Sequence, residues 1–207
     1  MAQNARLRTI LTLYSGTDNV QSHRVRMVLA AKGVSYDRLV VDPGKTPDDL
    51  LEMNPYGTLP TLVDRELVLY DTGVMCEYID ERYPHPPLMP VDPLSRARLR
   101  LAMIRIEQEW LPLIDAINAG GRNADTARKH LQGALVAALP LFRAGKFFLG
   151  SEISLADCLV APIVWRLPSL RIELPKDGKA MLDYGERIFA SQGFARSLTL
   201  EERALRE

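Results

Sequence analysis

The sequence predicts two domains in succession: a small α/β domain over residues 1–83 and an all-helical domain over residues 94–207, joined by a proline-rich linker at 84–93. Strand-like and helix-like segments alternate through the first domain, whereas every patterned segment after the linker has helical spacing. Five prolines occur in the eleven residues from Tyr83 to Pro93. Because proline lacks an amide hydrogen and fixes φ, no helix continues through this stretch, which marks the domain boundary.

The first domain is expected to have the order βαβ, then ββα. The predicted strands are 9–14, 35–41, 62–63 and 67–70, and the predicted helices are 22–33, 46–53 and 72–82. Gly33 fits a helix C-cap and Thr46 an N-cap, and the last two strands form a hairpin around Asp64 and Arg65. One side of the last helix is expected to carry Val74, Tyr78 and Ile79. This order is typical of a thioredoxin-like domain, whose first two strands pair in parallel through a right-handed crossover.

The second domain is predicted to be helical throughout. Its expected helices are 94–118, 124–143, 154–167, 180–191 and 199–206. An apolar stripe runs along the first of them, in which Pro112 is expected to cause a kink: Leu99, Met103, Ile106, Trp110 and Leu113. Ser154 and Asp157 have the spacing of a capping box, which we interpret as the structural start of a helix.

Composition excludes several classes of protein. The 207 residues are 47% hydrophobic, and 26 basic side chains balance 26 acidic ones. An intrinsically disordered chain has low hydrophobicity and high net charge, so this class is excluded. A histone-like nucleic-acid binder needs an overall positive field, which a formal net charge of zero does not supply. A local basic patch remains compatible with these numbers.

The expected location is the cytoplasm. Residues 1–8 are polar and lack the apolar segment of a signal peptide, and no run of about 18 apolar residues predicts a membrane span. Cys76 and Cys158 are too few for a disulfide framework and fit a reducing compartment. Both are interpreted as buried, unreactive thiols.

Two short motifs in the first domain suggest a ligand site. Leu59-Pro60 leads into a strand. If the peptide bond between them is cis, the backbone of Leu59 is exposed and can pair with an extended thiol peptide. The commoner interpretation is that Pro60 simply begins the strand. Asp71-Thr72 precedes a helix, where it either caps open amides or holds the charged groups of a ligand. The plain N-cap is the commoner of these two.

These motifs together resemble the cytosolic glutathione transferases. That family joins a thioredoxin-like domain to a helical one and has a Leu/Val-Pro turn, an acid-Ser/Thr pair and a Ser-x-x-Asp box in this order. The resemblance implies a glutathione-like pocket formed by Ser15, Leu59, Pro60, Asp71 and Thr72. We expect this pocket to be vestigial.

The expected catalytic position carries an unsuitable residue. The resemblance places Asn19 where such enzymes have the Tyr, Ser or Cys that holds glutathione as a thiolate. Asn19 has neither an ionisable proton nor a nucleophilic sulfur. Tyr14 ends a strand and is expected to be packed, whereas Ser15 remains able to reach a ligand. We therefore expect no catalytic residue and no cofactor.

A closer resemblance is to the stringent starvation protein A family. It rests on residues 23–35 (HRVRMVLAAKGVS), 54–67 (NPYGTLPTLVDREL) and 78–90 (YIDERYPHPPLMP), and continues at 165–168 (WRLP) and 172–174 (IEL). The resemblance implies a homodimer with the transferase fold that lacks transferase activity. It also implies association with the RNA polymerase holoenzyme and regulation of transcription under starvation and acid stress.

The same resemblance implies a partner-binding surface at Pro84, His85, Pro86 and Pro87. A proline-rich segment is already rigid, so docking it costs little conformational entropy. His85 is expected to project outward, and a histidine side chain changes charge near pH 6.5. Without the resemblance, the prolines would be interpreted as a linker that fixes the angle between domains.

Other charged side chains suggest less specific roles. Arg96 and Arg100 share one helix face, and Arg98 and Arg105 share another. These arginines form either a solvated helix surface or a docking patch for an acidic surface of the polymerase. No metal site is expected, because His23 and His130 lack companions at ligand spacing.

The sequence therefore predicts a polymerase-associated regulator without independent sequence-specific DNA binding or membrane association. The alternative is a glutathione transferase or glutathione-dependent thiol reductase. A third hypothesis is that the remnant pocket binds another small ligand, and a heterodimer with a related protein also remains open.

Overall fold

The computed structural model describes residues 11–206 and divides into two compact units. Among the described residues, the first unit covers 11–86 and Gln192–Ala204, and the second covers Pro87–Ser191 and 205–206. The division thus lies within the proline-rich segment. The sequence had assigned all of 94–207 to the helical domain, but the structure groups Gln192–Ala204 with the first unit. Sequence periodicity reveals helices but not the unit on which a short terminal helix packs.

The first unit contains a four-stranded sheet in the order β2-β1-β3-β4. Its strands are β1 (Thr12–Gly16), β2 (Asp37–Val41), β3 (Thr61–Asp64) and β4 (Leu67–Leu69). The predicted parallel β1–β2 pair and β3–β4 hairpin are confirmed. The hairpin turn is Arg65–Glu66, one residue later than predicted, and Arg65 has a φ of 57°. Residues 9 and 10 of the first predicted strand lie outside the described residues.

Five helices belong to this unit: α1 (Val20–Ala31), α2 (Asp48–Met53), α3 (Thr72–Arg82), α9 (Gln192–Ser197) and α10 (Leu200–Ala204). Gly33 follows α1 with a φ of +64°, as its predicted capping role requires. The predicted cap Thr46 is wrong, because Pro47 is the N-cap and its carbonyl accepts from the amides of Leu50 and Leu51. Helix α9 was not predicted.

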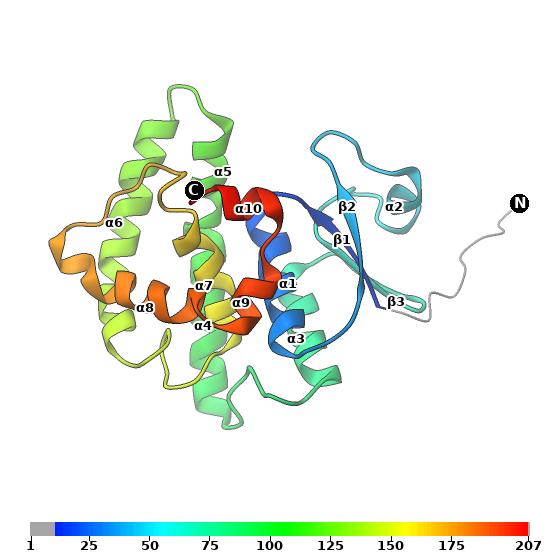
Figure 1. Cartoon of the computed structure of the whole chain (residues 1–207), viewed down its shortest axis with the longest axis horizontal. Coiled ribbons are helices and arrows are strands. Elements are labelled where there is room, and N and C mark those ends of the chain that lie inside the picture. Colours follow the sequence, from blue (N-terminus) through cyan, green and yellow to red (C-terminus); the bar gives the residue numbers. More distant parts are fainter. Residues whose placement is uncertain (1–10, 207) are drawn as a thin grey trace, which may run out of the picture. The chain divides into compact units, whose positions relative to one another are not determined.

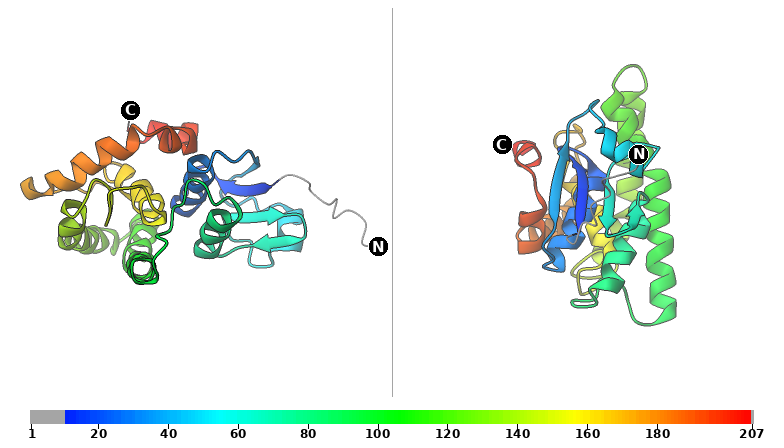
Figure 2. Two further views of the ribbon diagram at one scale, coloured as in Figure 1. Left: turned by 90° about the horizontal axis from the view of Figure 1, so that it is seen from below. Right: turned by 90° about the vertical axis from the view of Figure 1, so that its right-hand side faces the viewer.

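Successive side chains along each strand point to opposite faces of the sheet, so both faces are available for packing. Helices α1 and α3 lie on one face and α2 on the other (Figures 1 and 2). On the α2 side, Tyr14, Val41 and Val63 pack with Leu50 of the helix. On α3, the predicted apolar face is shifted: Val74 is exposed, whereas Met75, Cys76 and Ile79 are buried. The buried side chains follow helical spacing from Met75 rather than from Val74.

The second unit is helical, as predicted. It contains α4 (Pro93–Glu109), α5 (Leu111–Ala119), α6 (Ala124–Arg143), α7 (Leu155–Trp165), the short 3-10 helix η1 (Lys176–Gly178) and α8 (Lys179–Phe189). The single helix predicted over 94–118 is two helices that meet at Trp110. Pro112 lies in the first turn of α5, where its missing amide costs no hydrogen bond.

The start of α7 confirms the predicted capping box. The carboxylate of Asp157 accepts from the Ser154 amide and the Ser154 hydroxyl, both at 2.8 Å. It also accepts from the Phe148 amide at 2.8 Å and so joins the preceding loop to the helix. Burial raises the pKa of Asp157 to about 6, even though these hydrogen bonds favour the carboxylate.

Candidate functional site

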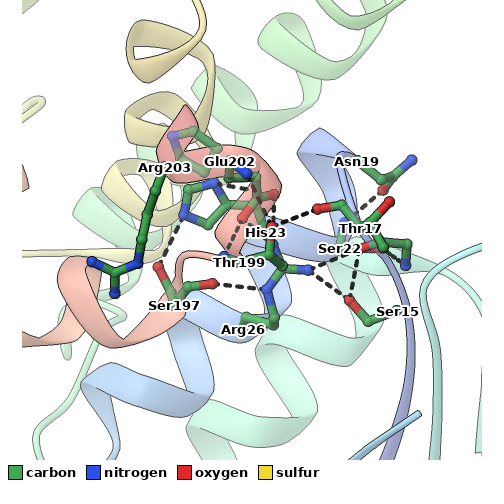
Figure 3. Close-up of polar contacts among 12 residues, drawn as sticks. Ser15, Thr17, Asn19, Ser22, His23, Arg26, Ser197, Thr199, Glu202 and Arg203 are labelled. Atoms are coloured by element: carbon green, nitrogen blue, oxygen red, sulfur yellow. Dashed lines mark hydrogen bonds and ion pairs between the residues drawn. The ribbon is translucent and has the colours of Figure 1, made fainter. Parts of the chain in front are cut away.

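The loop between β1 and α1 leads to Asn19, the residue that the resemblance aligns with the catalytic position. Asn19 is the N-cap of α1, and its side-chain oxygen accepts from the Ser22 amide at 2.7 Å (Figure 3). The Ser22 hydroxyl in turn accepts from the Gly16 amide at 3.1 Å. The side-chain oxygens of Asn19 and Ser22 therefore cap the helix and close the loop.

Ser15 is not open to a ligand, contrary to the expectation from sequence. Strand β1 continues through Gly16, and Ser15 is only 1% exposed. Its hydroxyl donates to the Gly16 carbonyl at 3.1 Å and accepts from the Arg26 guanidinium at 2.6 Å. Tyr14, predicted to be packed, is buried, and its hydroxyl donates to Asp49 at 2.5 Å.

A buried polar network behind Ser15 was missed by sequence reasoning. Arg26 donates through Nη2 to both carboxylate oxygens of Glu202, at 2.6 and 2.5 Å, and through Nε to the Ser197 carbonyl at 2.8 Å. His23 lies 2.9 Å from the Ser197 hydroxyl and 3.7 Å from Glu202. Figure 3 shows these side chains converging from α1 and from the C-terminal helices.

The network attaches α9 and α10 to the first unit. Its central ion pair is fully buried, so both charges depend on each other for solvation. The Thr199 hydroxyl adds a hydrogen bond to the Thr17 carbonyl at 2.8 Å. The sequence signal was the group of charged residues within an otherwise apolar helix, which requires partners but does not identify them.

The Leu59-Pro60 turn lies beside this loop. The peptide bond is cis, whereas the sequence favoured an ordinary strand start, because neighbouring structure rather than local preference selects the isomer. A Cβ built at Gly16 would lie 3.0 Å from Asn19 Cβ and 3.8 Å from Leu59 Cδ1. Of the predicted pocket residues, the structure thus brings Leu59 close to the end of β1.

Asp71 and Thr72 lie at the start of α3. The Asp71 carboxylate accepts from the Val74 amide at 2.9 Å, which is the N-cap role, and Thr72 is the first residue of the helix. The role of this pair in holding a ligand stays a prediction.

The predicted partner-binding segment is at the surface. Pro84, His85, Pro86 and Pro87 are all exposed, and the His85–Pro86 peptide bond is cis. Beneath the segment, the ammonium group of Lys32 donates to the Pro86 carbonyl and pairs with Asp80 at 2.6 Å. Sequence reasoning did not identify Lys32 or Asp80, which are distant from each other along the chain.

The four arginines of α4 do not form one patch. Arg96 donates to the Pro90 carbonyl at 3.1 Å, and Arg105 pairs with Glu109 at 2.9 Å. Arg98 and Arg105 are exposed on the same side of the helix as Leu94, Leu101 and Ile104. The side that they share is therefore mixed, apolar and basic.

Within residues 11–206, no group of three or more His, Cys, Asp or Glu side chains could hold a metal ion. Cys76 and Cys158 are buried, as predicted. Over the same residues, no helix is long and apolar enough to cross a membrane.

Comparisons with known proteins agree with this architecture. Residues 20–82 match the glutathione S-transferase N-terminal domain, and residues 101–192 match the C-terminal domain. A delta-class glutathione transferase from Nilaparvata lugens has a similar structure, with a TM-score of 0.83 and 20% identity over 94% of this chain and 96% of that one.

Relatives that match over nearly the whole of this chain identify its family more narrowly. The stringent starvation protein A homologue of Coxiella burnetii is 46% identical over 97% of each chain. That of Pasteurella multocida is 45% identical over 96% of this chain and 94% of the homologue. The chain belongs to the stringent starvation protein A family. The resemblance found in the sequence is thus confirmed, and this family member has the glutathione transferase fold.

Proposed function

We propose that this chain is a regulator of the starvation and stress response that binds the RNA polymerase holoenzyme and has no catalytic activity of its own. The observation that carries the proposal is the exposed Pro84–Pro87 segment in a full-length relative of stringent starvation protein A. Such a partner places the protein in the cytoplasm. Independent sequence-specific DNA binding is not part of this proposal, and a formal net charge of zero supplies no general attraction to DNA.

The lack of activity is supported by the β1–α1 loop. A transferase needs a side chain that donates to, or reacts with, the glutathione sulfur. Asn19 accepts a hydrogen bond from its own helix, and the Ser15 hydroxyl lies buried between Arg26 and Gly16. Asn19 has no hydroxyl or thiol, and the Ser15 hydroxyl is taken up by these internal hydrogen bonds.

The proposal is tested by capture of the purified holoenzyme on immobilised protein. We expect saturable capture by the wild type and weaker capture by the double variant Pro84→Ala with His85→Ala, since both residues are exposed and neither supports the core. Equal capture by the two proteins would remove this segment from the interface.

We also propose a homodimer, supported by the surface of α4. Leu94, Leu101 and Ile104 are 60%, 67% and 46% exposed and share one side of the helix. Large apolar side chains exposed along one row of a helix favour burial against another protein surface, even where basic side chains lie between them. A second copy presents the same row, as a two-fold interface requires.

The alternative function is a glutathione transferase or glutathione-dependent thiol reductase. The matches to both transferase domains favour it. Isothermal titration with millimolar glutathione separates the two functions. We expect no saturable heat; saturable binding together with turnover in a thiol-transfer assay would favour the enzyme.

A further inference from the structure

The Pro84–Pro87 segment has few ways to hold its own backbone in place. Three of its four residues are prolines, so three amide donors are missing. Hydrogen bonds that fix such a segment must therefore go mainly to its carbonyl oxygens. The structure supplies one of them, because the ammonium group of Lys32 donates to the Pro86 carbonyl.

Lys32 is itself held firmly. It is the C-cap residue of α1, and its side chain is fully buried. Its ammonium group pairs with Asp80 of α3 at 2.6 Å. A buried ammonium is stable only when paired and hydrogen-bonded, so its two known partners determine where it lies.

The pair connects rigid elements to the exposed segment. Helix α3 ends at Arg82, two residues before the segment, and carries Asp80 in its last turn. Lys32 adds a second attachment, from the end of α1 and paired with α3 through Asp80, at a point beyond His85 along the chain. The backbone on both sides of His85 is therefore tied to the packed helices.

We propose that Lys32, held by Asp80, is a positioning residue for the Pro84–Pro87 docking surface. By fixing the Pro86 carbonyl it sets the direction in which His85 is presented, although a partner docked on the exposed segment has no access to the buried ammonium. The inference rests on the proposed function for the identity of the partner. The positioning itself is a property of the free protein and is measured separately.

The first readout is the histidine spectrum of the full-length protein. The chain has three histidines, His23, His85 and His130, so three imidazole Hε1 signals are expected, and a His85→Gln variant assigns the relevant one. In Lys32→Met, which retains an unbranched side chain but removes the ammonium, the His85 signal is expected to shift while that of His130 stays in place. An unchanged His85 signal would overturn the positioning role.

The second readout is affinity for the RNA polymerase holoenzyme. Loss of one charge-assisted hydrogen bond is expected to weaken binding by about tenfold in Lys32→Met. Lys45→Met is the matched control, because Lys45 forms an exposed pair with Asp42 in the same unit, and it is expected to bind as the wild type does. Equal affinity of Lys32→Met and wild type, with urea unfolding confirming that both are folded, would overturn the inference.

Asp80→Asn keeps the test decisive if Lys32→Met does not fold. It retains an oxygen acceptor for the ammonium but removes the charge, so a smaller shift of the His85 signal and a smaller loss of affinity are expected. No change in either would count against the inference. If the wild type itself fails to bind the holoenzyme, the proposed function is contradicted, while the His85 signal still decides whether Lys32 positions the segment.

Discussion

At the scale of single residues, the most informative group is the buried Arg26–Glu202 pair. Both side chains are fully buried, and Arg26 also donates to Ser15 and Ser197. Such a pair is required mainly because each charge would be unsolvated without the other. Ser15, which the sequence predicted to face a ligand, is consequently part of the polar packing between α1 and the C-terminal helices.

This arrangement predicts a large cost for removing one partner alone. Arg26→Met leaves Glu202 buried without its cation and is expected to lower the free energy of unfolding by about 3–5 kcal/mol. Arg26→Met with Glu202→Gln is expected to recover part of this loss. Urea unfolding measures both, and Lys129→Met, at an exposed position of α6, should stay within about 0.5 kcal/mol of wild type. A loss under about 1 kcal/mol in Arg26→Met would contradict the account.

At the scale of elements, features set by residues close together in the sequence could be predicted, and those set by distant residues could not. The capping box of Ser154 and Asp157 and the glycine after α1 depend on neighbours within a few residues, and both were predicted correctly. The break at Trp110 was expected only as a kink. Helix α9, with six residues, is too short to show a periodic pattern.

The capping box predicts a pH dependence of stability. In the folded state the pKa of Asp157 is raised to about 6, mainly by burial, whereas an unfolded aspartate has a pKa near 3.9. The folded state therefore binds more protons between these values, and the stabilisation present below about pH 4 is lost as the pH rises through about 6.

The corresponding experiment compares wild type with Asp157→Asn, which cannot titrate. From pH 4.5 to 7.5, the free energy of unfolding of wild type is expected to fall by about 2 kcal/mol more than that of the variant. Urea unfolding at several pH values provides the measurement. Parallel pH profiles for the two proteins would show that Asp157 titrates normally in the fold.

Helix α4 predicts the oligomeric state. Leu101→Lys places a charge in the centre of the exposed apolar row and is expected to convert a dimer into a monomer, because the charge would be buried without a partner at the interface. Size-exclusion chromatography with light scattering measures the mass. The control is Leu182→Lys, an exposed leucine on α8 outside the row, which should remain dimeric. A monomeric wild type would contradict the proposed homodimer.

At the scale of the whole molecule, the order of elements and the family could be predicted, whereas the long-range polar contacts could not. Strand and helix patterns identified the sheet and the helical unit, because hydrophobic periodicity reports local burial. Arg26 and Glu202 are separated by 176 residues, and Lys32 and Pro86 by 54. Many other acidic groups and carbonyls in the chain were equally acceptable partners for these cations.

The exposed Pro84–Pro87 segment and the expected glutathione-like pocket also differ in how well they could be predicted from sequence. The segment Pro84–Pro87 was recognised from consecutive residues, and its exposure agrees with the prediction. The expected pocket was assembled from separated motifs, and its member Ser15 is buried. The structure therefore agrees more closely with the predicted docking segment than with the predicted pocket.

The central claim is that Pro84–Pro87 docks this protein onto RNA polymerase. The most direct measurement is the equilibrium affinity of purified full-length protein for the holoenzyme, for wild type and for Pro84→Ala with His85→Ala, with unfolding midpoints measured on the same samples. We predict saturable binding by wild type and at least about tenfold weaker binding by the variant at unchanged stability, a difference of about 1.4 kcal/mol. No binding by wild type, or equal binding by the two proteins, would contradict the claim.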